Sequence, residues 1–398
     1  MSSEIPETSS QRPSIESEQP RPLEEGLVNE RLVSLDALRG FDMFWIMGGK
    51  ALVVALATAT SAVWLQWIVA RMEHPAWDGF EPWDLIFPLF LFIAGVSTPL
   101  SIRHRRARGD SDRKIYFHVV TRAFLLVLLG IVYNGLPANW TAVESWGNVR
   151  YASVLGRIGL AYMFAALIAI NTKSLGRWLW LIGLLLGYWA ALRFIPVPEF
   201  GAGDLSEGHT LTDYIDRLLV PGVLYRGNGD PEGLLATIPA IATALLGVIT
   251  GQMLMRRDMS GWRKTIVMVL AGGVCVGLGW AWDQETWFHF PINKNLWSSS
   301  FVLYCAGWSL LLLALFYLVI DVFKFRWGVL FFTVIGANSI LIYMLPSFVD
   351  FQFTADRLLT GPSSLAGTYA PLVLVFGLFM LKWLLLYLLY RKRIFLKV

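Results

Sequence analysis

Long apolar segments constrain the fold of this chain more than any other feature of its sequence. About ten segments are each near the ~20 residues that a helix needs to cross the hydrocarbon core of a bilayer. They cover residues 37–62, 84–102, 117–136, 151–170, 177–196, 233–255, 264–282, 297–320, 327–349 and 369–390. Backbone groups in lipid must bond within their own segment, so we expect helices rather than strands. The sequence therefore predicts an all-α, polytopic membrane protein with about ten transmembrane helices in one bundle.

The composition agrees with a membrane protein. Of the 398 residues, 56% are hydrophobic and only 16% are charged, whereas a soluble domain carries about 25% charged residues. Residues 1–30 are rich in Ser, Pro and Glu, which predicts a disordered, acidic, cytoplasmic tail ahead of one transmembrane domain over 31–398. We expect the lipid bilayer as a partner, no nucleic acid and no metal site.

The basic residues of the short loops predict the orientation of the chain. One set of alternate loops holds eighteen Lys and Arg residues, and the other set holds six. The basic set comprises residues 103–114, 172–177, 256–264, 321–326 and 391–398. Cytoplasmic loops are enriched in Lys and Arg. We therefore expect the basic loops and both termini in the cytoplasm, and His74 on the outer side.

The stretch from His74 to Pro88, HPAWDGFEPWDLIFP, places a histidine and several carboxylates at the mouth of an apolar segment. A titratable cluster where a membrane helix meets water indicates a functional site. The alternative is an interfacial aromatic belt, with Trp77 and Trp83 at headgroup depth and the charges simply solvated. The stretch alone leaves both interpretations open.

Two further loops have unusual sequences. Residues 283–297, DQETWFHFPINKNLW, combine polar groups with more aromatic residues than a solvated loop needs, which favours a lined cleft. Asp230, Pro231 and Glu232 are suited to a binding site, but they also suit a helix start, as an N-cap, a proline at the first position and an acid in the first turn.

Several polar residues fall inside the predicted helices, where they need a partner or a water-filled cavity. Asp36 and Arg39 are three residues apart and share a helix face, so they suit an internal ion pair. Arg157 and Asn338 also lie in predicted helices. The sequence does not separate pairing from cavity lining for these residues.

Eight strings resemble the transmembrane acyltransferases related to heparan-α-glucosaminide N-acetyltransferase, in the same order along the chain. They are RLVSLDALRGFDMF (31–44), HPAWDGFEPWDLIFPLFLFIAG (74–95), VLGRIGLAY (154–162), YIDRLL (214–219), DPEGLLATI (230–238), PINKNLWS (291–298), GANSILIYM (336–344) and RKRIFLKV (391–398). The resemblance implies transfer of an acetyl group from cytosolic acetyl-CoA to an amino sugar across the membrane. It also implies that the catalytic histidine on the far side is His74.

The chain also departs from that family. The lysosomal enzyme has a luminal region and an extra helix ahead of the first string, and it has an Asn where this chain has Met47, before Gly48 and Gly49. The chain therefore resembles the shorter bacterial members, which implies a bacterial inner membrane and leaves heparan sulfate unassigned as a substrate. Relatives suggest a homodimer, on which these residues do not bear.

Acetyl transfer to an amine needs a base and donors for the oxyanion. Histidine titrates near neutrality, so His74 suits the base, with Asp84 or Glu73 to orient its ring. We expect the acceptor to contact Trp77, Asp230, Glu232, Lys294, Asn295 and Asn338. We expect the phosphates of coenzyme A to contact Arg157, Arg103, Arg105 and Arg106, although loops of that kind are basic for topological reasons alone.

Two alternatives accompany this interpretation. His289 is a rival catalytic residue, because it lies in the second loop with a site-like composition. A polytopic transporter of a small polar solute is the rival function, since about ten helices with buried charges also suit a transporter. No inverted repeat or pair of matched broken helices is clear in the sequence.

Overall fold

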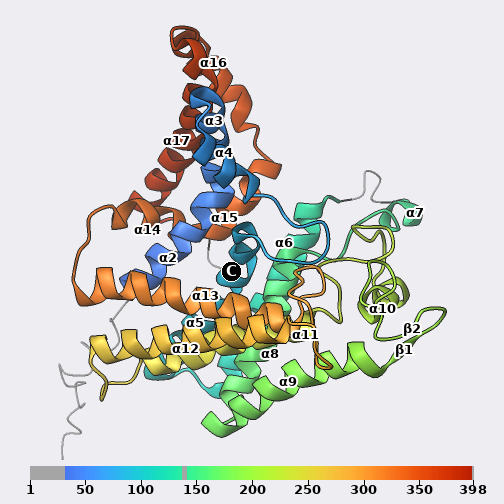
Figure 1. The fold of residues 1–398 in the computed structure, drawn as a ribbon. Coiled ribbons are helices and arrows are strands. Elements are labelled where there is room, and N and C mark those ends of the chain that lie inside the picture. The colour runs from blue at the N-terminus through green and yellow to red at the C-terminus, as the bar shows by residue number, and fades with distance from the viewer. Residues whose placement is uncertain (1–31, 137–140, 397–398) are drawn as a thin grey trace, which may run out of the picture. The chain divides into compact units, whose positions relative to one another are not determined.

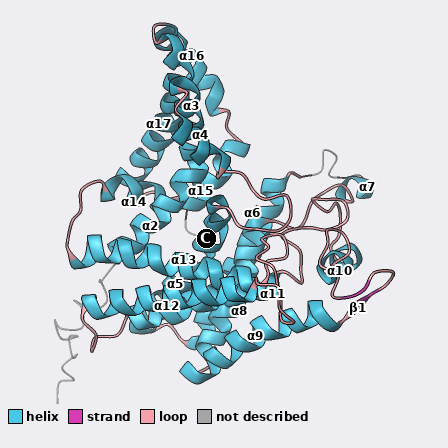
Figure 2. Ribbon diagram, viewed as in Figure 1, coloured by secondary structure: helices cyan, strands magenta, loops and turns pink. Residues whose placement is uncertain are grey.

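The computed structural model describes residues 32–136 and 141–396, so the predicted tail at 1–30 lies outside the described residues. The described residues are helical, apart from their connections and one two-stranded antiparallel hairpin (Figure 2). The hairpin pairs β1 (Pro196–Val197) with β2 (Gly201–Ala202). The predicted all-α class is confirmed.

The described residues contain nine helical spans long and apolar enough to cross a membrane, and a bent helix pair makes a tenth (Figure 1). The prediction of about ten membrane helices is confirmed. The nine are α2 (Val33–Phe44) continued by η1 (Trp45–Gly49) and α3 (Lys50–Thr60), η2 (Pro82–Leu85) continued by α5 (Ile86–Ala107), α6 (Asp112–Asn134), α8 (Val154–Asn171), α9 (Ser174–Phe194), α11 (Thr237–Leu254), α12 (Gly261–Trp282), α13 (Ser299–Phe316) continued by η3 (Tyr317–Val322), and η5 (Gly367–Tyr369) continued by α17 (Ala370–Arg391).

The connections between these helices alternate between two ends of the helix bundle. We call the end that holds residues 71–81, 195–236 and 283–298 the His74 end, and the end that holds residues 108–111 and 255–260 the Arg105 end. Short helices lie in the connections between the membrane spans. They are α4 (Val63–Ala70), α7 (Val143–Trp146), α10 (Leu211–Leu219) and α16 (Phe351–Ser364).

Glycines allow the closest helix contacts. A Cβ on Gly95 of α5 would lie 2.1 Å from the carbonyl oxygen of Ala244 in α11, and one on Gly247 would lie 2.2 Å from that of Phe92. Only a residue without a side chain lets two backbones approach so closely. Helices α12 and α13 also lie side by side (Figure 1). The seam with α11 fixes α5, which begins directly after Asp84 and Leu85.

The polar residues inside the helices differ in whether they have a hydrogen-bond or ion-pair partner. Arg39 and Asp36 form an ion pair at 3.2 Å, which is one of the two arrangements that the sequence left open, and Arg39 also donates to Ser97 at 2.9 Å. Asp42 is buried, and neither of its carboxylate oxygens has a hydrogen-bond partner among the described residues.

The tenth span is broken at Asn338. Helices α14 (Val329–Ala337) and α15 (Ser339–Met344), with η4 (Leu345–Ser347), meet at an angle of 73°. The amide of Asn338 donates to the carbonyl of Ile394 at 3.0 Å and accepts from the backbone N–H of Leu396 at 2.9 Å. Asn338 thus binds the C-terminal segment 394–396 at the break.

Candidate functional site

The ring of His74 is oriented by a buried carboxylate. Its Nδ1 lies 2.5 Å from Oδ1 of Asp84, whose side chain has no exposed area, while 47% of the His74 side chain is exposed. A capping box at the start of η2 positions Asp84, because its Oδ2 accepts the backbone N–H of Glu81 at 3.0 Å. The other candidate, Glu73, instead pairs with Lys50 at 2.7 Å. Asp84, rather than Glu73, therefore orients the ring.

Lys294 completes a triangle with His74 and Asp84. Its Nζ lies 3.0 Å from Nε2 and 3.2 Å from Nδ1 of His74, and 3.4 Å from Oδ1 of Asp84. Burial lowers the pKa of the Lys294 ammonium, while the charges of Asp84 and Glu232 oppose that shift. The fold therefore brings a histidine, a carboxylate and an amine from two distant loops into one cluster.

Asn293 joins the two loops that carry this cluster. Its amide donates to Oδ1 of Asp78 at 2.7 Å, and its oxygen accepts from the backbone N–H groups of Asn295 at 2.8 Å and Leu296 at 3.0 Å. The backbone N–H of Gly79 also donates to the carbonyl of Ile292 at 3.0 Å. Asn293 is fully buried, and we had not predicted it as a site residue.

Trp77 and Asn295 lie at the edge of the cluster. The Asn295 amide is 3.5 Å from the carbonyl of Trp77, and the indole N–H of Trp77 donates to the carbonyl of Leu205 at 2.9 Å. The guanidinium of Arg226 lies 5.0 Å from the Trp77 ring centroid. The Arg226 guanidinium thus already lies against the ring on which we predicted that a sugar stacks.

Asp230 and Glu232 are bound by an arginine that we had not predicted. Arg150 donates to the two oxygens of Asp230 at 2.8 and 2.7 Å and also to Glu232. Burial acts to raise the pKa of Asp230, but the bonds and charge of Arg150 outweigh it and hold that pKa below its ordinary value. The predicted helix start is wrong, because α11 begins at Thr237 and Asp230 caps a turn instead, accepting the N–H of Glu232 at 2.9 Å. Arginine is scarce in the loops of this end, which was the one available signal for Arg150.

Arg157 lies at the same end and is 2% exposed. Its guanidinium lies 5.0 Å from the ring centroid of Trp297 and donates to the carbonyl of Gly233 at 3.4 Å. The indole N–H of Trp297 in turn donates to Thr243 of α11 at 3.2 Å. Arg157 therefore packs beneath the loop that carries Lys294.

The other three predicted coenzyme contacts are at the opposite end of α5. Arg105 pairs with Asp110 at 3.2 Å and Arg106 pairs with Asp112 at 3.1 Å, whereas Arg103 is exposed. The structure does not bring these three residues together with Arg157.

The rival histidine has a weaker setting. Nδ1 of His289 lies 3.3 Å from the carbonyl oxygen of Gln284, and no described carboxylate orients its ring. No group of three or more His, Cys, Asp or Glu side chains within the described parts of the chain is placed to hold a metal ion.

Comparison with known proteins gives relatives along most of the chain. No family model matches. A protein of Homo sapiens named heparan-alpha-glucosaminide N-acetyltransferase is 30% identical over 419 residues, which cover 92% of this chain and 60% of the human protein. A protein of Mus musculus with the same name is 31% identical over 379 residues, covering 82% of this chain and 56% of the mouse protein. The chain thus spans less than two thirds of the length of these relatives.

Proposed function

Because this chain belongs to a family related to heparan-alpha-glucosaminide N-acetyltransferase, we propose that it is a membrane-bound N-acetyltransferase with His74 at its reaction centre. One observation carries this proposal: Asp84, which is buried, lies 2.5 Å from Nδ1 of His74, whose ring is half exposed. A carboxylate on Nδ1 fixes the proton there and leaves Nε2 as the basic atom. The donor is cytoplasmic acetyl-CoA, and the acceptor is an amino sugar or glycan on the outer side of a bacterial inner membrane.

The reaction breaks the thioester C–S bond of the donor and forms an amide C–N bond on the acceptor. His74 takes the proton that the amine loses, and the thiolate of coenzyme A leaves. Oxyanion stabilisation needs a donor beside the base. Lys294 has an ammonium 3.0 Å from Nε2 of His74, which suits that task. Asn295 is the second donor that we assign to the acceptor or the oxyanion.

The residues that we predicted to contact the acceptor differ in how well their contacts support that role. Trp77 and Lys294 adjoin His74 through their loops, and we assign them to the acceptor. Asp230 and Glu232 both bind Arg150, whose single charge offsets one of their two, so we assign them to shaping the site. Asn338 is occupied by the backbone of segment 394–396, and this contact favours a structural role.

The residues that we assign to the acetyl donor lie at opposite ends of the helix bundle. Arg103, Arg105 and Arg106 supply the cations that coenzyme phosphates need. Arg157 is distant from those three and packs on Trp297, so any coenzyme contact that it makes is with the acetyl end of the molecule. Arg157→Ala should then change the rate of transfer more than the affinity for desacetyl coenzyme A.

A transporter is the alternative function, and the broken span at Asn338 is the feature that favours it. The repeats of such transporters carry matched breaks, and the described residues contain one bent pair. The test uses purified protein in nanodiscs with labelled acetyl-CoA and glucosamine. Formation of N-acetylglucosamine that requires His74 supports the transferase. Uptake of the sugar into proteoliposomes without acetylation would overturn it.

A further inference from the structure

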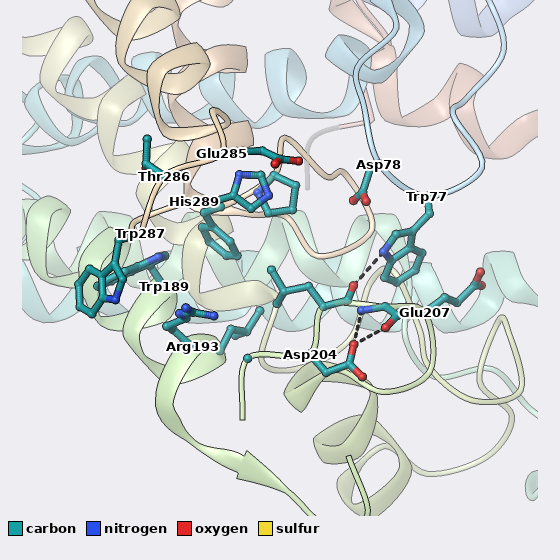
Figure 3. A pocket seen from close by; sticks show the side chains of 16 residues that line it. Trp77, Asp78, Trp189, Arg193, Asp204, Glu207, Glu285, Thr286, Trp287 and His289 are labelled. Carbon is teal, nitrogen blue, oxygen red and sulfur yellow. Dashed lines mark hydrogen bonds between the residues drawn. The ribbon is translucent and has the colours of Figure 1, made fainter. Parts of the chain in front are cut away.

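A cavity of about 920 Å³ opens at the His74 end (Figure 3). Its lining comes from four segments: residues 77–78, the end of α9 at 189–193, residues 203–207 and residues 285–291. Its volume is at the upper end of the ~300–1,000 Å³ found for ligand pockets. The cavity therefore has room for more than one sugar ring.

The cavity adjoins the catalytic cluster through shared loops. Trp77 and Asp78 line it and lie three and four residues after His74. Asp78 is held by Asn293, which precedes Lys294. A ligand in this cavity thus lies next to the segments that position His74 and Lys294.

Aromatic rings form the two ends of the cavity. Trp189 and Trp287 lie together at one end, and Trp77 lies at the other (Figure 3). Phe288 contacts both members of the first group, with ring centroids 5.5 Å from Trp189 and 4.8 Å from Trp287. The Trp287 ring is exposed, outside the membrane-spanning helices. Flat aromatic faces with a polar surround suit the apolar faces of sugar rings.

The charge of the lining is negative. Four carboxylates line the cavity, from Asp78, Asp204, Glu207 and Glu285, against one guanidinium, from Arg193. Glu207 is also paired with Arg226 at 3.0 Å from outside the lining. Glu285 is exposed and has no ion-pair partner among the described residues.

The remaining two acids, Asp78 and Asp204, are bound by groups that do not carry a permanent positive charge. The Asn293 amide on Asp78 brings no charge. Asp204 accepts from Ser206 and from His209 at 3.0 Å. The bonds from Ser206 hold the pKa of Asp204 below its ordinary value, so this side chain is ionised at neutral pH. The cavity therefore keeps a net negative charge.

We propose that this cavity binds the glycan of the acceptor and selects glycans with amino and hydroxyl groups over glycans with acidic groups. The inference rests on the proposed acetyl transfer at His74. Carboxylates accept hydrogen bonds from hydroxyl and ammonium groups, whereas they repel sulfate and uronic-acid groups brought close to them. The cavity thus supplies a discrimination between acceptors that His74 and Lys294 alone do not.

Calorimetry tests this inference. It measures the binding of three tetrasaccharides to the full chain in nanodiscs, without acetyl-CoA. The probes are a glucosamine tetramer, its fully N-acetylated form, and a heparin-derived tetrasaccharide. We expect the affinity to fall in that order, and the affinity of the glucosamine tetramer to fall further as salt is added. Tighter binding of the heparin-derived probe than of the glucosamine tetramer would overturn the proposal.

Matched variants separate charge from stacking. Glu285→Gln should weaken the glucosamine tetramer about threefold to tenfold and leave the N-acetylated form unchanged, whereas Glu144→Gln, an exposed acid outside the cavity, should alter neither. Trp287→Ala should weaken both probes about tenfold, and Trp287→Phe should recover most of that loss. Both sites are exposed, so the variants should keep the melting temperature of the parent. Parent-like binding by Glu285→Gln and Trp287→Ala would refute the assignment.

The same probes distinguish this inference from the proposed function. If His74→Ala retains the order of affinities while no preparation transfers acetyl groups, the cavity assignment stands as a glycan site and the transferase fails. If glucosamine is acetylated through His74 while the three probes bind equally, the transferase stands and the selectivity of the cavity is refuted.

Discussion

His74 combines a half-exposed ring with a buried carboxylate behind it. His74→Ala should reduce transfer at least by the ~10²–10⁴-fold of a lost general base. If His74 carries the acetyl group, acetyl-CoA supplied without acceptor should leave an acetylated peptide that contains residue 74. If His74 is the base, no adduct should accumulate. Mass spectrometry of the parent separates the two roles, and His289→Ala tests the rival histidine. Near-parental transfer by His74→Ala would end the assignment.

Asp84 gives a second prediction at this scale. Asp84→Asn keeps an acceptor for the N–H of Glu81 but removes the charge that orients His74. We expect the kcat to fall about tenfold or more with little change in the KM for the acceptor. Glu73→Gln is the control, since Glu73 pairs with Lys50. Equal effects of both substitutions would show that the carboxylate does not act through the ring.

Much of the site could be predicted from the sequence, but its pairings could not. The titratable string gave His74 and Asp84, and the aromatic loop gave Lys294. The bond between Asp78 and Asn293 joins residues 215 positions apart, and no local pattern encodes such a contact. The same limit hid Arg150, which reaches Asp230 from 80 residues away.

Helix α10 carries Asp216, whose burial raises its pKa to about 7. Its Oδ1 accepts the N–H of Leu234 at 2.9 Å, and Oδ2 has no hydrogen-bond partner among the described residues. A pKa raised by folding favours the native state at low pH, and this contribution is lost as the pH rises through about 7. We expect the melting temperature to fall by about a few degrees between pH 5 and pH 8.

Asp216→Asn should remove this part of the pH dependence, because the amide does not ionise. Thermal unfolding in one detergent at both pH values is the measurement. Asp356→Asn, on the exposed side of α16, is the control and should retain the parental slope. A parental slope in Asp216→Asn would show that another group titrates in this range.

The break between α14 and α15 holds the C-terminal segment through Asn338. Asn338→Leu removes both bonds to segment 394–396 and leaves the carbonyl of Ile394 and the N–H of Leu396 without that partner. The expected cost is about 1–3 kcal/mol, because two hydrogen bonds are lost and each contributes about 0.5–1.5 kcal/mol. Limited carboxypeptidase digestion should then shorten the variant faster than the parent. Equal digestion rates would mean that the segment is held by other contacts.

The membrane helices were predictable because length and polarity decide them. The break at Asn338 was not predictable, because most of residues 327–349 are apolar and the segment has the length of one continuous span. The amphipathic helices α10 and α16 were missed because they are shorter than a membrane span. The helix start at Asp230 failed because Arg150 binds that carboxylate in a turn, so that a tertiary contact overrides the local signal.

For the whole molecule, the distribution of basic residues predicts which end faces the cytoplasm. Cysteines introduced at Ser111 and Ser206, both exposed, should react with an impermeant reagent from opposite sides of intact cells. The native Cys275 and Cys305 would first be replaced by alanine. Labelling of Ser111→Cys only after permeabilisation is expected. Labelling of both positions from outside would place the basic loop in the same compartment as His74 and refute the predicted topology.

The length of α5 has a consequence for the donor. Asp84 and Arg105 stand at its two ends, about 32 Å apart at 1.5 Å per residue. Coenzyme A joins its pyrophosphate to its sulfur by a single pantetheine arm, which is shorter than that span. A coenzyme whose pyrophosphate lies at the Arg105 end of α5 therefore does not reach His74 with its thioester. Either the nucleotide moves into the helix bundle before transfer, or the acetyl group travels in two stages. Under the proposed donor assignment, the basic loop is where the coenzyme first binds, and the reach of its pantetheine arm limits where it can react.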